Sequence, residues 1–187
     1  MRTLLVALCV VFLAGPWITG AGAQSELAAE YQQLVTQRQK LEQKRREYEA
    51  SIASLSSQIR SLNMVFFQCV SLKEKEFWET RINETNTAKD QLEVQRKELA
   101  VLRNRIDAAR KTLEKRRREI EASHTRKGPG TPYETEFRTY MAALESDYFQ
   151  PLQHQLFDGY EQYGQAVRSY IDLLKDSVSR CMKRDGG

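Results

Sequence analysis

The segment His124-Thr-Arg-Lys-Gly-Pro-Gly-Thr-Pro-Tyr133 is the one dense group of helix-breaking residues beyond the first 23 positions, and helical patterns lie on both sides of it. Gly128 and Pro129 are typical of the residues just past a helix end. Thr131, followed three residues later by Glu134, forms a capping-box pattern that starts a new helix. Stop and start signals this close together predict a tight reversal, the tip of an antiparallel helical hairpin.

The composition favours long helices on both sides of this tip. Of the 187 residues, 29% are charged, and the chain holds only 9 glycines and 4 prolines. A chain rich in Glu, Lys, Arg, Gln and Leu is typical of coiled coils, so the sequence predicts an all-α fold. The net charge of +4 is too small to indicate a nucleic-acid-binding protein.

The first 23 residues have the pattern of a secretory signal peptide. Arg2 precedes an apolar run from Leu4 to Ile18, and Ala21-Gly22-Ala23 has the small residues of a cleavage site. The apolar run is about 15 residues long, short of the ~20 that span a bilayer. We therefore expect export, to a periplasm or to the outside of the cell, and a mature chain that begins at Gln24.

Removal of that segment leaves two cysteines, Cys69 and Cys181. An even pair in an exported protein indicates one disulfide bond. Two buried thiols, or a bond to another chain, are the alternatives.

A heptad pattern begins near Ser25 and continues to Cys69, with apolar residues at steps of three and four. Arg38 and Arg45 occupy two positions of this seam. Between Leu62 and Val70 the pattern is apolar on more than one face, which indicates more than one neighbour. The apolar seam residues are Leu27, Tyr31, Leu34, Leu41, Tyr48, Ile52, Leu55, Ile59, Leu62 and Phe66.

The heptad pattern is lost between Lys73 and Lys89 and returns, out of frame, from Leu92 to Ile120. Residues 83–87, Asn-Glu-Thr-Asn-Thr, have low helix propensity. Either one helix continues through a shift of frame, or the chain turns near 83–87 and a new helix begins there.

A third helical pattern occupies residues 134–187, after the tip loop at 124–133. Pro151 is expected to kink or restart this helix. Gly159 and Gly164 are expected to loosen its next turns. The last three residues, Asp-Gly-Gly, predict a frayed C-terminus.

These patterns allow two arrangements. In the first, residues 24–123 form one long coiled-coil helix, and residues 134–187 fold back along its second half as a hairpin. In the second, the chain also turns near Asn83 to give an up-down-up bundle of three helices. A turn at Asn83 would place Cys69 far from Cys181, whereas a disulfide needs Cα atoms within ~7 Å. The cysteine pair therefore favours the first arrangement, in which the acidic returning segment also lies against the basic helix before the tip.

The first arrangement leaves residues 25 to about 62 without a partner helix in the same chain. An apolar seam of that length is not stable alone in water. We therefore expect a homodimer through residues 25–70, or a helix of another protein bound there. The apolar residues expected at this contact are Leu62, Met64, Val65, Phe66, Phe67 and Val70.

A basic run before the tip is a second candidate surface. It could bind anionic lipid headgroups or an envelope polymer, although basic runs on helices are more often a solvated face. Its residues, with the two cations of the tip, are Lys115, Arg116, Arg117, Arg118, Arg126 and Lys127.

The sequence holds no pattern of a catalytic or cofactor site: no Ser/His/Asp arrangement, no Gly-rich phosphate loop and no paired-cysteine zinc motif. His154 and Asp158, four residues apart, are too few ligands for a metal. The tyrosines between residues 148 and 170 have the spacing of a packed seam rather than of a ligand pocket.

We therefore expect neither an enzyme nor a cofactor. The sequence predicts an exported structural or interaction protein, an adaptor or chaperone-like scaffold that acts through helix–helix contacts. The alternative is an anion-binding protein of the envelope or membrane surface.

Overall fold

The computed structural model describes residues 19–71 and 75–184, and the side chains of residues 26–69 and 78–182. Outside the tip, the described residues are helical, and none of them is in a strand. The elements are α1 (Thr19–Ser71), α2 (Lys75–Ser123), α3 (Pro132–Leu144), the π-helical turns η1 (Glu145–Phe149) and η2 (Leu152–Leu156), and α4 (Phe157–Arg184). The predicted all-α fold is confirmed.

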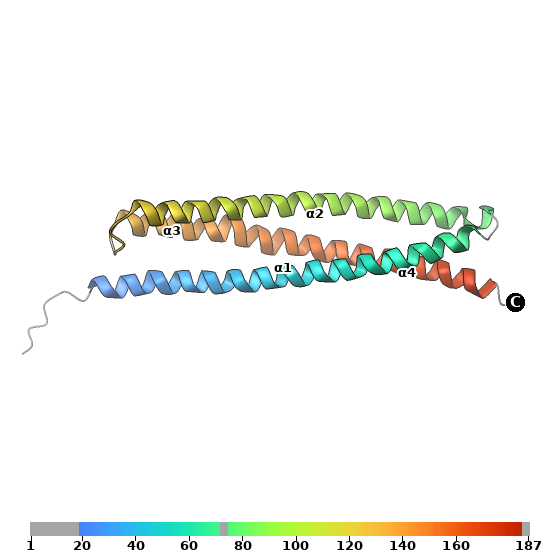
Figure 1. Cartoon of the computed structure of the whole chain (residues 1–187), viewed down its shortest axis with the longest axis horizontal. Coiled ribbons are helices and arrows are strands. Elements are labelled where there is room, and N and C mark those ends of the chain that lie inside the picture. Colours follow the sequence, from blue (N-terminus) through green and yellow to red (C-terminus); the bar gives the residue numbers. More distant parts are fainter. Residues whose placement is uncertain (1–18, 72–74, 185–187) are drawn as a thin grey trace, which may run out of the picture.

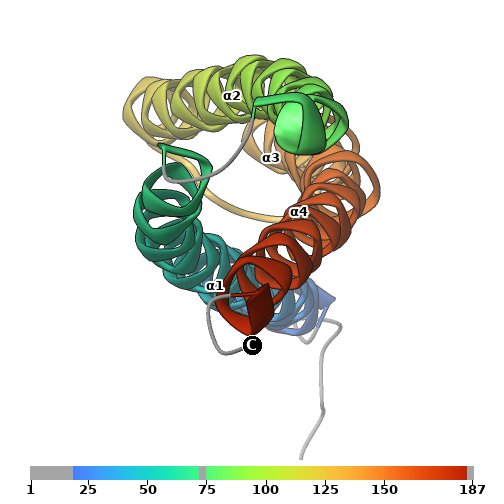
Figure 2. The same ribbon diagram turned by 90° about the vertical axis from the view of Figure 1, so that its right-hand side faces the viewer.

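The helices form three antiparallel rods (Figure 1). α1 and α2 run in opposite directions, and residues 132–184, here called the returning arm, run parallel to α1. Within the returning arm, α3 and both π turns pack mainly on α2, and α4 packs on α1 and also on α2. α1 and α2 pack mainly on the arm and little on each other. Figure 2 shows the three rods arranged around a common axis.

Of the two predicted arrangements, the structure has the three-helix bundle, and the expectation of one helix through residues 24–123 is wrong. The first reversal lies between Ser71 and Lys75, and α2 is continuous through residues 83–87. Thr85 is buried there, and Ile82 packs against the same core as Trp78. Tertiary packing therefore overrides the low helix propensity of these residues.

Cys69 and Cys181 form a disulfide with Cα atoms 6.0 Å apart. Because α1 ends at Ser71, Cys69 lies at the end of its rod, and the parallel returning arm brings Cys181 to the same level. A three-helix bundle was expected to separate the cysteines because the first reversal was expected near Asn83; α1 in fact ends at Ser71, and the bundle keeps them together.

The N-terminal half of α1 has partners within the chain. The Tyr31 ring lies 5.2 Å from that of Phe137, and the Tyr48 ring 5.4 Å from that of Phe157, measured between ring centroids. The reason for expecting a homodimer through residues 25–70 is thereby removed, and self-association stays a prediction.

The tip reverses the chain between Ser123 and Pro132, as its stop and start signals predict. Its left-handed residue is Gly130, with φ of 68°, rather than Gly128. The carboxylate of Glu134 accepts a hydrogen bond from the Gly130 N–H at 2.8 Å, and the Thr131 hydroxyl donates to the Gly128 carbonyl. The capping box is therefore replaced by a loop in which both side chains hold the two glycines.

Pro151 does not break the returning arm, because a π-helical turn lies on each side of it. In η1 the Gln150 N–H donates to the Glu145 carbonyl, and in η2 the Phe157 N–H donates to the Leu152 carbonyl, five residues back in both cases. A π turn holds one residue more than an α turn.

The π turns keep the seam in register. The buried positions here are Leu144, Tyr148, Leu152, Leu156 and Tyr160. They advance by four residues at every step. The interval from 144 to 160 is therefore 16 residues, two more than the 14 of two heptads. Each π turn takes up one extra residue, so the seam continues on the same face in α4.

Gly159 permits a close approach of α2 rather than loosening α4. A Cβ atom at this position would lie 2.7 Å from the Leu99 side chain. The expectation that Gly159 loosens the helix is therefore wrong, since the glycine lets α2 and α4 pack tightly.

Candidate functional site: the groove between α1 and α2

The groove is the space between residues 31–53 of α1 and residues 96–118 of α2, and the returning arm forms the floor of its middle part. Long side chains connect its two walls. Arg45, which is 9% exposed, donates hydrogen bonds of 2.7 and 3.1 Å to the two oxygens of Asp107, and Arg38 pairs with Glu114. The arginines that interrupt the predicted apolar seam therefore join α1 to α2, as does Arg110 of α2, which pairs with Glu42 of α1 at 3.4 Å.

The middle of the groove contains a hollow of about 340 Å³ with an apolar bottom and a charged rim. Tyr160 and Tyr163 of α4 form its floor, and Arg96 and Arg103 of α2 stand at its rim. The other lining residues are Glu49, Ile52, Ala53, Leu99 and Ala100.

A second hollow, of about 590 Å³, lies nearer the tip. Four arginines and two carboxylates line it, so its balance of charge is positive. These residues are Arg38, Arg46, Arg117 and Arg118, with Glu42 and Glu114. The remaining lining residues are Tyr31, Val35 and Gln39.

A row of arginines at heptad spacing makes the α2 wall basic: Arg96, Arg103, Arg110 and Arg117. Among the described residues, Arg103 has no hydrogen bond or ion pair, and its charge acts on Asp107 only at longer range. This row was not predicted from the sequence, although its constant step of seven residues is visible there, because the contiguous basic run at 115–118 is more conspicuous.

Polar contacts of the returning arm with α1 also follow the heptad. Three tyrosine hydroxyls of the arm donate to acceptors on α1, and these acceptors, at 42, 49 and 63, are spaced by seven or fourteen residues. The pairs are Tyr148 with Glu42, Tyr160 with Glu49 at 3.0 Å, and Tyr170 with Asn63 at 3.2 Å. A hydroxyl left unpaired in the interior would cost about 1–3 kcal/mol, so these contacts fix the register of the arm on α1.

Burial raises the pKa of several tyrosines in this layer. It raises the pKa of Tyr140 to about 12. Burial and then the neighbouring Glu49 carboxylate raise the pKa of Tyr160 to about 12. Burial and the hydrogen bond to Glu42 raise the pKa of Tyr148 still further above its ordinary value.

These shifts predict a loss of stability in alkali. The tyrosines of the unfolded chain titrate near pH 10, whereas Tyr140 and Tyr160 keep their protons until about pH 12. Their contribution is therefore complete below about pH 10 and is lost as the pH rises towards about 12. At about pH 11 each should lower the free energy of unfolding by about 1 kcal/mol.

Urea unfolding at a series of pH values measures this effect, and Tyr160→Phe should reduce the slope of stability against pH. Titration of every tyrosine near pH 10, followed by ultraviolet absorbance of the folded protein, would contradict the prediction.

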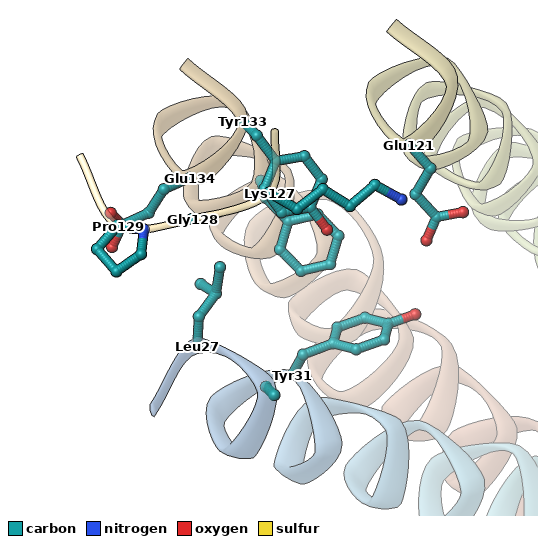
Figure 3. Close-up of a pocket in the computed structure, with 10 residues that line it drawn as sticks. Leu27, Tyr31, Glu121, Lys127, Gly128, Pro129, Tyr133 and Glu134 are labelled. Carbon is teal, nitrogen blue, oxygen red and sulfur yellow. The ribbon is translucent and has the colours of Figure 1, made fainter. Parts of the chain in front are cut away.

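A separate cavity of about 480 Å³ lies at the tip, between the start of α1, the loop and the start of α3 (Figure 3). Its walls are mostly apolar. The lining residues are Leu27, Ala28, Tyr31, Glu121, Lys127, Gly128, Pro129, Tyr133, Glu134 and Phe137. Tyr31 also lines the hollow nearer the tip, so the cavity adjoins the groove.

The predicted contact residues at 62–70 divide between core and surface. Phe66 is 3% exposed and its ring lies 6.3 Å from that of Trp78, so it belongs to the core. Met64 and Phe67 are 63% and 65% exposed and remain available for contact. Leu62 and Val65 are half-buried, and the side chain of Val70 lies outside the described residues.

The predicted anion-binding residues do not form one surface. Lys115 pairs with Glu119, and Arg117 with Glu121. Arg117 and Arg118 face the hollow nearer the tip, whereas Lys127 lines the tip cavity. Arg116 and Arg126 are exposed. Consecutive helical residues point about 100° apart, so a run of four cannot share one face. Anion binding itself stays a prediction.

Most of the tyrosine stripe is packed in the core: Tyr148, Tyr160, Tyr163 and Tyr170 are buried. His154 and Asp158 are both exposed. Within residues 19–71 and 75–184, no three of the His, Cys, Asp and Glu side chains are grouped so that they could hold a metal ion. No helix in the described part of the chain has the length and apolarity needed to cross a membrane.

No family model, curated protein or solved structure matches this chain.

Proposed function

We propose that this chain is an exported, non-enzymatic interaction protein that binds an amphipathic helix of another protein in the groove between α1 and α2. The helix would place apolar residues in the middle hollow, against Tyr160 and Tyr163, and acidic residues against the α2 wall. The observation that carries this proposal is the basic heptad row of α2, which stands above an apolar floor.

The charge of the groove favours an acidic partner over a second copy of the chain. Its two hollows are lined by six arginines and three glutamates, a formal balance of three positive charges. Two copies that met through their grooves would bring like charges together, which opposes association. An acidic helix would be attracted to the same surface.

The dimensions of the groove suit a helix. Residues 31–53 of α1 line the two hollows, and at 1.5 Å per residue this length is about 33 Å, or six helical turns. Ile52, Leu99 and Tyr163 offer apolar contact on the floor. Helices that bind in such grooves present apolar residues at steps of three and four.

Export is supported by the signal-peptide pattern of the first 23 residues and by the disulfide, because disulfides persist in oxidising compartments. The disulfide holds α1 to the returning arm at the end of the bundle opposite the tip, which would keep the groove open in one shape.

Photocrosslinking from single positions tests the proposal. A benzoylphenylalanine in place of Ala100, which lines the middle hollow, should capture a protein in intact cells. The same group in place of Val101, which is 70% exposed and points to another side of α2, is the matched control and should not.

The captured segment should be an amphipathic helix with acidic residues, as mass spectrometry of the crosslinked peptide would show. Arg103→Glu should weaken capture about tenfold, because it reverses a charge at the rim of the middle hollow that has no ion pair among the described residues. Equal capture from Val101, no effect of Arg103→Glu, or a captured segment without acidic residues would refute the proposal.

A further inference from the structure

The loop beside the tip cavity is held in one conformation. Gly130 adopts φ of 68°, which side-chain-bearing residues rarely adopt. The Gly130 N–H donates to Glu134, and the Thr131 N–H donates to the Gly128 carbonyl at 3.3 Å. The wall that the loop contributes is therefore formed before any ligand arrives.

Arg138 fastens the opposite wall. Its Nε donates to Glu134 at 3.1 Å, and one of its terminal nitrogens donates to Glu30 of α1 at 2.8 Å. This single guanidinium links the loop side of the cavity to the first turns of α1. The cavity is thus bounded by elements that are tied together rather than by a chance separation of helices.

The cavity surface is aromatic. The Tyr31 ring meets the Phe137 ring edge to face at 5.2 Å, and the Tyr133 ring stacks on Phe137 at 5.4 Å. Leu27 is 9% exposed and covers the α1 side. Aromatic rings pack edge to face or with offset faces, so a further ring would find both kinds of surface here.

The charged groups at the cavity already have partners within the chain. Glu121 pairs with Arg117 at 2.9 Å, and Glu134 with Arg138. Lys127 lies 5.7 Å from the centre of the Tyr133 ring, and in Figure 3 its ammonium end points towards the side of the cavity where Glu121 lies. A bound molecule therefore needs no charge of its own.

We propose that the tip cavity binds a small uncharged aromatic molecule of one or two fused rings. A cavity of about 480 Å³ lies within the range of small-molecule sites, and its preformed aromatic walls lower the entropy cost of binding. This site is separate from the binding of a partner helix in the groove and does not depend on it.

Titration of the purified protein with indole, followed by calorimetry and by two-dimensional NMR, tests the proposal. Saturable binding is expected with Kd on the order of 1 mM or tighter, and with contacts from indole protons to the rings of Tyr133 and Phe137. Ala28→Trp should fill the cavity and weaken binding at least about tenfold. Ala29→Trp adds the same bulk at an exposed position that does not line the cavity, and should bind like the wild type.

Absence of saturable binding by the wild type would overturn the proposal. Unchanged binding by an Ala28→Trp variant that melts like the Ala29→Trp variant would mean that indole binds elsewhere. This result would also overturn the proposal. N-acetyltryptophanamide should bind more weakly than indole, since its two amide groups add bulk and would lose hydrogen bonds to water on entering a mostly apolar cavity. The reverse order would assign the cavity to a tryptophan side chain of a protein and would overturn the small-molecule proposal.

Discussion

Replacement of Cys69 and Cys181 by serine is expected to lower the free energy of unfolding by about 5 kcal/mol. The bond closes a loop with a sequence separation of 112 residues, and the loss of chain entropy in the unfolded state on closing a loop of this length corresponds to about 5 kcal/mol at room temperature. It also holds the end of α1 against the end of α4, far from the tip connection.

Urea unfolding followed by circular dichroism measures this difference. The wild-type protein in the presence of a reducing agent is the matched control, and its unfolding midpoint should coincide with that of the double variant. A double variant as stable as the oxidised wild type would show that the disulfide does not stabilise the bundle.

Deletion of Ser169 is expected to be far more damaging than deletion of His154, although both residues are exposed. One residue removed from an α-helix rotates everything beyond it by about 100°. Without Ser169, the side chains of Tyr170, Leu174 and Cys181 would leave the seam. Each large apolar side chain is worth about 1.5–3 kcal/mol when buried, so the total loss should exceed about 5 kcal/mol.

His154 lies in η2, and its deletion should convert the π turn into an α turn while the residues beyond keep their face. The expected cost is below about 2 kcal/mol, within the range of ordinary substitutions. Thermal unfolding and a count of free thiols separate the two variants, because only the Ser169 deletion should leave Cys69 and Cys181 unpaired. Equal losses in the two variants would mean that the π turns do not absorb the extra residues.

The heptads, the tip and the cysteine pair could be predicted because each has a local or compositional signal. Apolar residues at steps of three and four require a helix with one buried stripe. Gly128 and Pro129, followed by Thr131 and Glu134, require a stop and a new start within a few residues. Even the π turns have a signal, the repeated step of four from Leu144 to Tyr160, although it became interpretable only with the structure.

The first reversal had no such signal. The sequence between Ser71 and Lys75 is Leu-Lys-Glu, without glycine or proline, whereas the poor helix formers at 83–87 lie inside α2. The position of the turn agrees instead with packing at the end of the bundle, where Phe66 meets Trp78 and Cys69 meets Cys181. Poor helix formers cost some tenths of a kcal/mol per residue, which is small beside the roughly 1.5–3 kcal/mol that burial of one large apolar side chain contributes.

The sequence alone determines the helical class, the amphipathic stripe of each helix and the place of the tip, since these features depend on residues a few positions apart. The arrangement of the helices set the rest: which arginine of α1 meets which carboxylate of α2, which tyrosine reaches Glu42 or Glu49, and where the groove and tip cavity open. These contacts join residues 62 to 111 positions apart, and Arg45 with Asp107 and Tyr160 with Glu49 are the two ends of that range. Their partners are selected by the direction and register of whole helices, which no short stretch of sequence specifies.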